Sequence, residues 1–244
     1  MNYKYKNNVS GSYFFNILTG SFLFLFIILS FQQVKAQQND AGLWANIYLE
    51  KKLVKHLNAH LNQQYRWNNN ISTYHLGYAD MGLTYKVAKF MNATLDYVFM
   101  ERRYISNKYN SEYFSARHQF YFDLTFKYDI NNLKIHYRSM VQAQIKDVYS
   151  SEAGKVPSYY FRNKLTLQYN LSRRLKPYLA CEIYYNFLHP SGNEFDRTRY
   201  FGGIFYALSL QNELEFYYLI QRNYNVKDPT NDYVIGLGFS HIFK

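Results

Sequence analysis

The sequence predicts an all-β fold, an antiparallel transmembrane β-barrel of about 10–12 strands with short periplasmic turns and longer extracellular loops. Three observations predict it: apolar and polar residues alternate along most of the chain, short and long connections follow one another in turn, and aromatic residues are abundant. Tyr and Phe supply 28 and 20 of the 244 residues, whereas the mean hydropathy of -0.42 is that of a water-soluble protein. A barrel with an aromatic lipid face and a polar inner face accounts for both values.

The first 36 residues have the organisation of a secretory signal peptide. Two lysines near the start supply positive charge, an apolar run covers 22–29, and the tripeptide 34–36 ends in Ala, so cleavage is expected before Gln37. An uncleaved anchor helix is the alternative, but the apolar run is short beside the roughly 20 residues that a membrane helix needs. We therefore expect an exported protein in which 1–36 is cleaved and 37–244 is a single barrel domain.

After the leader, eleven segments alternate with a period of two, the pattern of a strand whose two faces meet different surroundings. The pattern is clear in 133–146, where Leu133 and Ile135 alternate with Lys134 and His136. Most segments hold 9–13 residues, close to the roughly 9–11 with which a tilted strand crosses a bilayer. The expected strands are 42–50, 56–67, 75–86, 91–103, 114–128, 133–146, 159–170, 177–187, 198–208, 213–222 and 232–243.

The connections between these segments alternate in length, as expected when short turns face the periplasm and long loops face outward. The ten strands from 56 to 243 fit this scheme, but segment 42–50 adds an eleventh that starts from the outer side. Bacterial single-chain barrels have an even number of strands, so the pattern leaves the role of this segment open. Short turns are expected near 51–55, 87–90, 131–132, 171–176 and 208–212, and longer loops at 68–74, 104–113, 147–158, 188–197 and 223–231.

Alternation alone does not say which face points outward, because a soluble barrel encloses its apolar face and a membrane barrel exposes it. The apolar face would supply roughly fifty bulky groups, whereas side chains already fill the interior of a barrel of about eight strands. The volume therefore favours an apolar outer surface in lipid. Two packed sheets are the alternative that could also bury these groups.

The last segment ends in the manner common among outer-membrane strands. Tyr233, Ile235, Leu237 and Phe239 share one face with Phe243, a pattern that the barrel-insertion machinery recognises. We therefore expect the outer membrane of a Gram-negative envelope as the location, with outer-membrane lipids and the insertion machinery as partners.

Charge and cysteine content exclude some other classes of protein. The net charge is +11, but the basic residues are spread along the strands and form no run, so we expect no nucleic-acid partner. Cys181 is the one cysteine, so no disulfide can form within the chain. The oligomeric state stays open.

Six short stretches, taken in order, resemble the family known as domain of unknown function 2490. The resemblance covers nearly all of 40–244, and it implies an exported outer-membrane barrel with no assigned activity and no family catalytic or binding residues. The stretches are Asp40-Ala41-Gly42-Leu43-Trp44, Leu49-Glu50-Lys51-Lys52-Leu53, Asp80-Met81-Gly82-Leu83-Thr84-Tyr85-Lys86, Arg117-His118-Gln119-Phe120-Tyr121-Phe122-Asp123-Leu124, Phe161-Arg162-Asn163-Lys164-Leu165 and Gly236-Leu237-Gly238-Phe239-Ser240.

The polar face of the predicted strands carries most of the candidate functional residues. One interpretation is a narrow pore for small solutes, whose basic lumen steers anions. The alternative is a closed structural or interaction barrel, filled by ion pairs and hydrogen bonds. The candidate lumen residues are His56, His60, Arg66, Asp80, Asp96, Arg102, Arg117, Asp123, Arg138, Arg162, Lys164, Glu182 and Arg199.

A membrane-embedded lipid hydrolase is a third class, but no catalytic motif supports it. Ser240 and His241 are neighbours in the chain and therefore point to opposite faces of a strand, and Ser139 falls on the apolar face. His56 and His60 would lie about 13 Å apart on one strand, too far for one metal. We expect no enzyme activity, no cofactor and no metal site.

Overall fold

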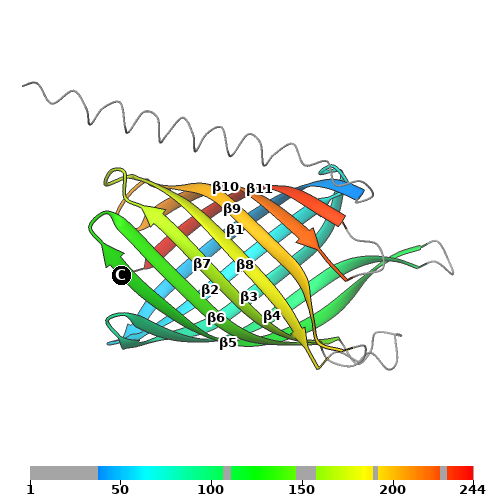
Figure 1. The fold of residues 1–244 in the computed structure, drawn as a ribbon, viewed down its shortest axis with the longest axis horizontal. Helices are drawn as coiled ribbons and strands as arrows, with labels where there is room; N and C mark the ends of the chain where they lie inside the picture. The colour runs from blue at the N-terminus through cyan, green and yellow to red at the C-terminus, as the bar shows by residue number, and fades with distance from the viewer. Residues whose placement is uncertain (1–37, 107–110, 147–157, 189–191, 226–229, 244) are drawn as a thin grey trace, which may run out of the picture. The chain divides into compact units, whose positions relative to one another are not determined.

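The computed structural model describes residues 38–106, 111–146, 158–188, 192–225 and 230–243. Within these residues, eleven strands form a closed barrel (Figure 1). The expected signal peptide, 1–36, lies outside them, so its cleavage stays a prediction. The strands are β1 (Gln38–Val54), β2 (Leu57–Asn68), β3 (Thr73–Ala88), β4 (Met91–Ser106), β5 (Ser111–Ile130), β6 (Leu133–Lys146), β7 (Ser158–Tyr169), β8 (Leu175–Phe187), β9 (Glu194–Ala207), β10 (Asn212–Asn223) and β11 (Thr230–Phe243).

Each of the eleven expected segments corresponds to one strand. The bounds of β6 match the prediction, whereas β1 extends well beyond the expected 42–50 because it pairs along its length with a second neighbour, β11. The placement of His56 on a strand was wrong. His56 lies in the two-residue turn between β1 and β2 with a φ of 71°, a turn conformation that a strand does not contain.

The barrel closes through a parallel seam between β1 and β11. The pairing runs from Gln38 opposite Thr230 to Lys51 opposite Phe243, whereas every pair of consecutive strands is antiparallel. In a meander the strand direction alternates, so an odd strand number makes the first and last strands run the same way. Segment 42–50 is therefore a true eleventh strand, and closure leaves neither terminal strand with a free edge.

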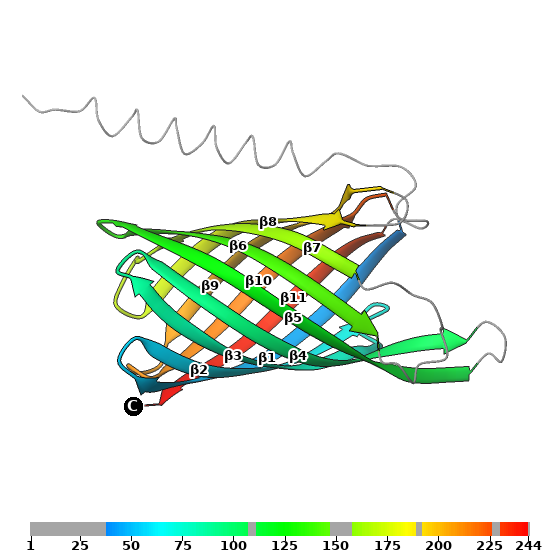
Figure 2. The same ribbon diagram turned by 90° about the horizontal axis from the view of Figure 1, so that it is seen from below.

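Successive connections lie at alternating ends of the barrel, which we call the turn end and the loop end (Figure 2). The loop-end connection 69–72, within the expected long loop 68–74, is as short as 208–211 at the turn end, because β2 and β3 extend into that expected loop. The turn end holds connections such as 55–56, 89–90 and 131–132, together with the C-terminal end of β11. No helix in the described part of the chain is long and apolar enough to cross a membrane.

The barrel exposes its apolar face and encloses its polar one. Leu95 and Leu179 on the outer surface are each 62% exposed, whereas Glu182 inside is 2% exposed. Closure into one barrel excludes the alternative of two packed sheets. An outer surface rich in Leu, Ile, Phe and Tyr is stable in lipid and not in water, so the structure is that of a membrane-spanning barrel.

The seam can be tested by cross-linking. In a chain carrying Cys181→Ala, we expect Leu49→Cys with His241→Cys to form a disulfide, because the two positions are register partners across β1 and β11. The cross-link would change the gel mobility of the heat-denatured chain and disappear on reduction. As a control, Leu49→Cys with Phe239→Cys moves one sulfur about 7 Å along the same face and should not cross-link. Equal cross-linking of both pairs, or of neither, would contradict the register.

Candidate functional site in the barrel lumen

The inner residues of ten strands, β1 to β10, line a cavity of about 440 Å³. Side chains alternate along each strand, so every second residue of these strands points into the lumen. The lining reaches from Ser158 and Arg197, near the loop-end bounds of β7 and β9, to Tyr178 and Glu215, near the turn-end bounds of β8 and β10.

Cationic side chains outnumber acidic ones in this lining. The low-dielectric wall and the lipid beyond it focus the field of these charges into the lumen. The lining of the cavity therefore carries an excess of positive charge. Its eight cationic residues are Arg66, Arg102, Arg117, Arg138, Arg162, Lys164, Arg197 and Arg199, and its three acidic residues are Asp80, Glu182 and Glu215.

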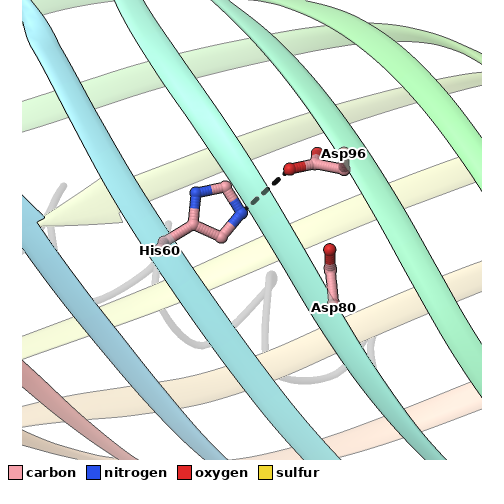
Figure 3. A group of neighbouring side chains, drawn as sticks. All are labelled: His60, Asp80 and Asp96. Atoms are coloured by element: carbon pink, nitrogen blue, oxygen red, sulfur yellow. Dashed lines mark ion pairs between the residues drawn. The ribbon is translucent and has the colours of Figure 1, made fainter.

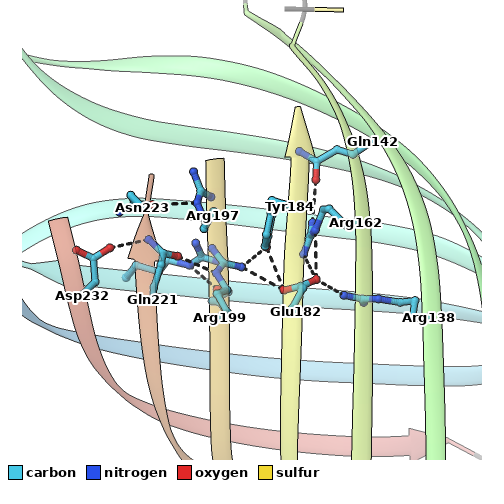
Figure 4. A network of polar contacts seen from close by, with 12 residues as sticks. Arg138, Gln142, Arg162, Glu182, Tyr184, Arg197, Arg199, Gln221, Asn223 and Asp232 are labelled. Atoms are coloured by element: carbon cyan, nitrogen blue, oxygen red, sulfur yellow. Dashed lines mark hydrogen bonds and ion pairs between the residues drawn. The ribbon is translucent and has the colours of Figure 1, made fainter. Parts of the chain in front are cut away.

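Glu182 on β8 is the centre of the main ion-pair network (Figure 4). Its Oε1 accepts hydrogen bonds from Arg138 Nη2 at 2.8 Å and from Arg162 Nη2 at 2.7 Å. Arg199 Nη1 lies 3.7 Å from Oε2, and Tyr184 donates its hydroxyl proton to the same oxygen at 3.1 Å. One carboxylate thus holds three guanidinium groups from three other strands, β6, β7 and β9.

The network continues along the wall from Glu182 towards the seam. Arg199 Nε donates to Gln221 Oε1 at 2.7 Å, and Gln221 Nε2 donates to Asp232 Oδ2 at 2.6 Å. The contacts therefore link six neighbouring strands, β6 to β11 (Figure 4). They follow the wall and fix the side-chain positions around half of the lumen.

A second cavity of about 360 Å³ lies nearer the turn end. Its lining includes Tyr48 and Glu213, and it shares Asn46, Asn62 and Glu215 with the first cavity. These three polar side chains therefore border both cavities.

Three of the candidate residues gather where β2, β3 and β4 run side by side (Figure 3). His60, Asp80 and Asp96 each place one possible ligand atom within 4.8 Å of the others. His60 Nε2 lies 2.9 Å from Asp96 Oδ1, although the two residues are on strands separated by β3. A search along one strand could not find this group, because its members come from three strands.

Gly82 on β3 makes this meeting possible. A Cβ atom at this position would lie 1.6 Å from Asp96 Oδ1 and 2.5 Å from His60 Cε1. Any side chain here would occupy the space in which the imidazole and the carboxylate meet. The stretch Asp80-Met81-Gly82 is the signal in the sequence that could have pointed to the cluster.

The structure distributes the thirteen sequence-predicted residues among three places. Nine line the larger cavity: Arg66, Asp80, Arg102, Arg117, Arg138, Arg162, Lys164, Glu182 and Arg199. His60, Asp96 and Asp123 lie on inner faces outside that lining, with Asp96 and Asp123 each 5% exposed. His56 is exposed in its turn and does not face the lumen.

Sequence reasoning missed several lumen residues. Arg197 was expected in the loop 188–197, but it lies on β9 and lines the cavity because that strand begins at Glu194. Tyr184 and Tyr217 also line the cavity. They were missed because an aromatic residue in the sequence suits the lipid-facing surface as well as the lumen.

The Ser and His residues considered for a hydrolase do not pair with each other. Ser240 donates its hydroxyl proton to the backbone carbonyl of Glu213 at 3.4 Å. His241 Nδ1 lies 2.6 Å from Asn212 Oδ1. The arrangement at these two positions is therefore not that of a nucleophile and its base.

The family model described as "Protein of unknown function (DUF2490)" matches residues 41–232. No curated protein matches the sequence. Among solved structures, the beta domain of the Bordetella autotransporter BrkA is similar over 75% of this chain and 82% of its own, with 10% identity and a TM-score of 0.45.

Two further solved structures are similar to parts of the chain. OmpT of Vibrio cholerae is similar over 68% of this chain and 54% of its own, with 9% identity and a TM-score of 0.42. The translocator domain of the autotransporter NalP from Neisseria meningitidis is similar over 74% of this chain and 72% of its own, with 11% identity and a TM-score of 0.40.

Proposed function

The chain belongs to the DUF2490 family, whose function is unknown, and we propose that it is an outer-membrane pore that prefers small anions. The observation that carries the proposal is the excess of eight cationic over three acidic side chains in the lining of the larger cavity. The apolar outer surface supports a place in a bilayer, and the expected signal peptide supports export to the outer membrane.

The size and chemistry of the lumen suit small solutes with a carboxylate or phosphate group. A volume of about 440 Å³ is within the range of small-molecule sites, about 300–1,000 Å³. Guanidinium groups bind such anions through paired hydrogen bonds, and seven of the eight cations are arginines. The solute would enter at the loop end and leave past Asn46, Asn62 and Glu215 towards the turn end.

Arg66 shows how a lumen cation can be held in position by side chains other than a carboxylate. Its guanidinium lies 3.7 Å from the centre of the Trp44 ring and 5.3 Å from that of Tyr78. Nε donates to Gln64 at 2.6 Å. Aromatic faces hold the cation in place without neutralising it, so its field still acts on a passing anion.

Conductance across a planar bilayer tests the proposal. With purified mature protein and a KCl gradient, we expect current whose reversal potential shows preference for chloride. Arg66→Gln should reduce this preference measurably, because it removes one lumen charge. Arg174→Gln, which removes an exposed charge in the turn between β7 and β8, is the matched control and should leave the preference unchanged.

Absence of current at every voltage would contradict the pore and support the closed interaction barrel. A preference for potassium over chloride would contradict the preference for anions but not the presence of a pore. We propose a pore without enzyme activity, and hydrolysis of phospholipid or lipopolysaccharide by the purified barrel would contradict this.

A further inference from the structure

We propose that His60, Asp80 and Asp96 form a binding site for a divalent transition-metal ion inside the barrel. The site lies on β2, β3 and β4, and its argument does not depend on the pore. A metal there would join three neighbouring strands from within the lumen (Figure 3).

The distances are close to those that a bound ion needs. One nitrogen or oxygen atom from each residue lies within 4.8 Å of the others, and His60 Nε2 is 2.9 Å from Asp96 Oδ1. A tetrahedral zinc ion with bonds of about 2.0–2.2 Å holds its ligand atoms roughly 3.3–3.6 Å apart. Small side-chain rotations would therefore bring the three residues to ligand geometry.

Asp80 provides an independent sign that a ligand is expected. The residue is 8% exposed, and its Oδ1 has no hydrogen-bond partner within the described residues. Tyr121 donates its hydroxyl proton to the other oxygen, Oδ2, at 2.6 Å. In Figure 3 the Asp80 carboxylate points towards the His60–Asp96 pair. A buried carboxylate oxygen without a partner is costly, and a cation between the three side chains would satisfy it.

The charges around the cluster also favour a cation. The charged groups that act most strongly on Asp80 are Asp96, His60 and Arg138. Arg138 donates to Glu182 at 2.8 Å, so its guanidinium group is directed towards that carboxylate, which it shares with Arg162 and Arg199. Two carboxylates then face one imidazole, and with neutral His60 a divalent ion balances their charge.

The donor set narrows the choice of ion. One imidazole with two carboxylates suits a first-row divalent metal such as zinc, iron or manganese. Calcium is less suited, because it prefers ligands that are all oxygen. Asn62 is the register partner of Asp80 on β2, and its buried Oδ1 also has no hydrogen-bond partner in the described part. It is available as a further oxygen donor, with water completing the coordination.

Isothermal titration of the EDTA-treated, detergent-solubilised mature barrel with ZnCl₂ tests the site. We expect saturation near one zinc per chain. His60→Gln and Asp96→Asn should each weaken binding at least tenfold, the low end of what loss of a ligand or its orienting partner costs. His136→Gln and Asp232→Asn remove a histidine and a carboxylate from other inner strand faces and should bind like the unaltered chain.

Heat-modifiable gel migration would establish that each variant is folded before its titration. Two ligand variants are used so that one misfolded protein does not decide the outcome. The proposal is overturned if the unaltered barrel binds no zinc at millimolar concentration, or if both folded ligand variants bind as tightly as it does.

Discussion

Replacement of Glu182 by alanine is expected to destabilise the folded barrel by about 3–5 kcal/mol, the cost of removing one partner from a buried ion pair. Glu182 is 2% exposed, and it accepts hydrogen bonds from both Arg138 and Arg162. Without it, those two guanidinium groups and that of Arg199 would face one another inside the lumen with no carboxylate among them. Their mutual repulsion and lost hydrogen bonds both act against the folded state.

Reversible urea unfolding from lipid vesicles, followed by tryptophan fluorescence, measures this loss. Glu182→Gln is the more conservative variant, because it keeps the size of the side chain and removes only its charge. It should still be clearly less stable than the unaltered barrel. If the alanine variant does not fold and the glutamine variant does, the result would also support a stabilising role for Glu182.

Glu213→Ala is the matched control for this experiment. Glu213 pairs with Lys176, but their side chains are 27% and 28% exposed, so water screens the pair. A partly exposed pair of this kind should contribute little more than the roughly 0–1 kcal/mol of a surface pair, and its loss leaves one cation unpaired instead of three. If Glu182→Ala cost no more than Glu213→Ala, the network of Figure 4 would not be a main source of stability.

The strands could be predicted from the sequence because their signal is local. Alternation along 133–146 depends only on which residues are apolar, and β6 has those bounds. The same alternation placed Arg138 and Glu182 on the inner face. The turn position of His56 was missed, because polar residues suit both a turn and the polar face of a strand.

The role of segment 42–50 and the two side-chain clusters could not be predicted, since both depend on pairing between distant segments. Whether β1 joins β11 is decided by closure, not by any residue within 42–50. His60 and Asp96 meet only because Gly82 is the register partner of both, on the strand between them. A shift of two residues in either register would separate them, and period-two alternation excludes odd shifts but not a shift of two.

Replacement of Gly82 by alanine is the second change with a large expected effect. The new Cβ would collide with Asp96 Oδ1 and with the ring of His60, so one or both side chains must move. Overpacking of this kind costs about 1–3 kcal/mol of folding stability. Zinc binding should fall by at least a hundredfold, about 2.7 kcal/mol, because both ligands leave their positions together.

The matched control is Gly202→Ala on β9, where the nearest atom to a new Cβ would be Leu179 Cδ2 at an ordinary 3.5 Å. That change should leave both stability and zinc affinity close to those of the unaltered chain. Equal behaviour of the two alanine variants would contradict the role given to Gly82.

A double replacement separates the steric effect from the loss of the metal site. With Asp96→Ala already present, the closest contact of the new Cβ at Gly82 is gone, so Gly82→Ala should then cost less stability than it does alone. Zinc binding should nevertheless stay weak, because a ligand is missing. If Gly82→Ala cost as much in the Asp96→Ala background, the strain would arise from the backbone of β3 or from His60. The close approach of Asp96 would then not be the reason for glycine at this position.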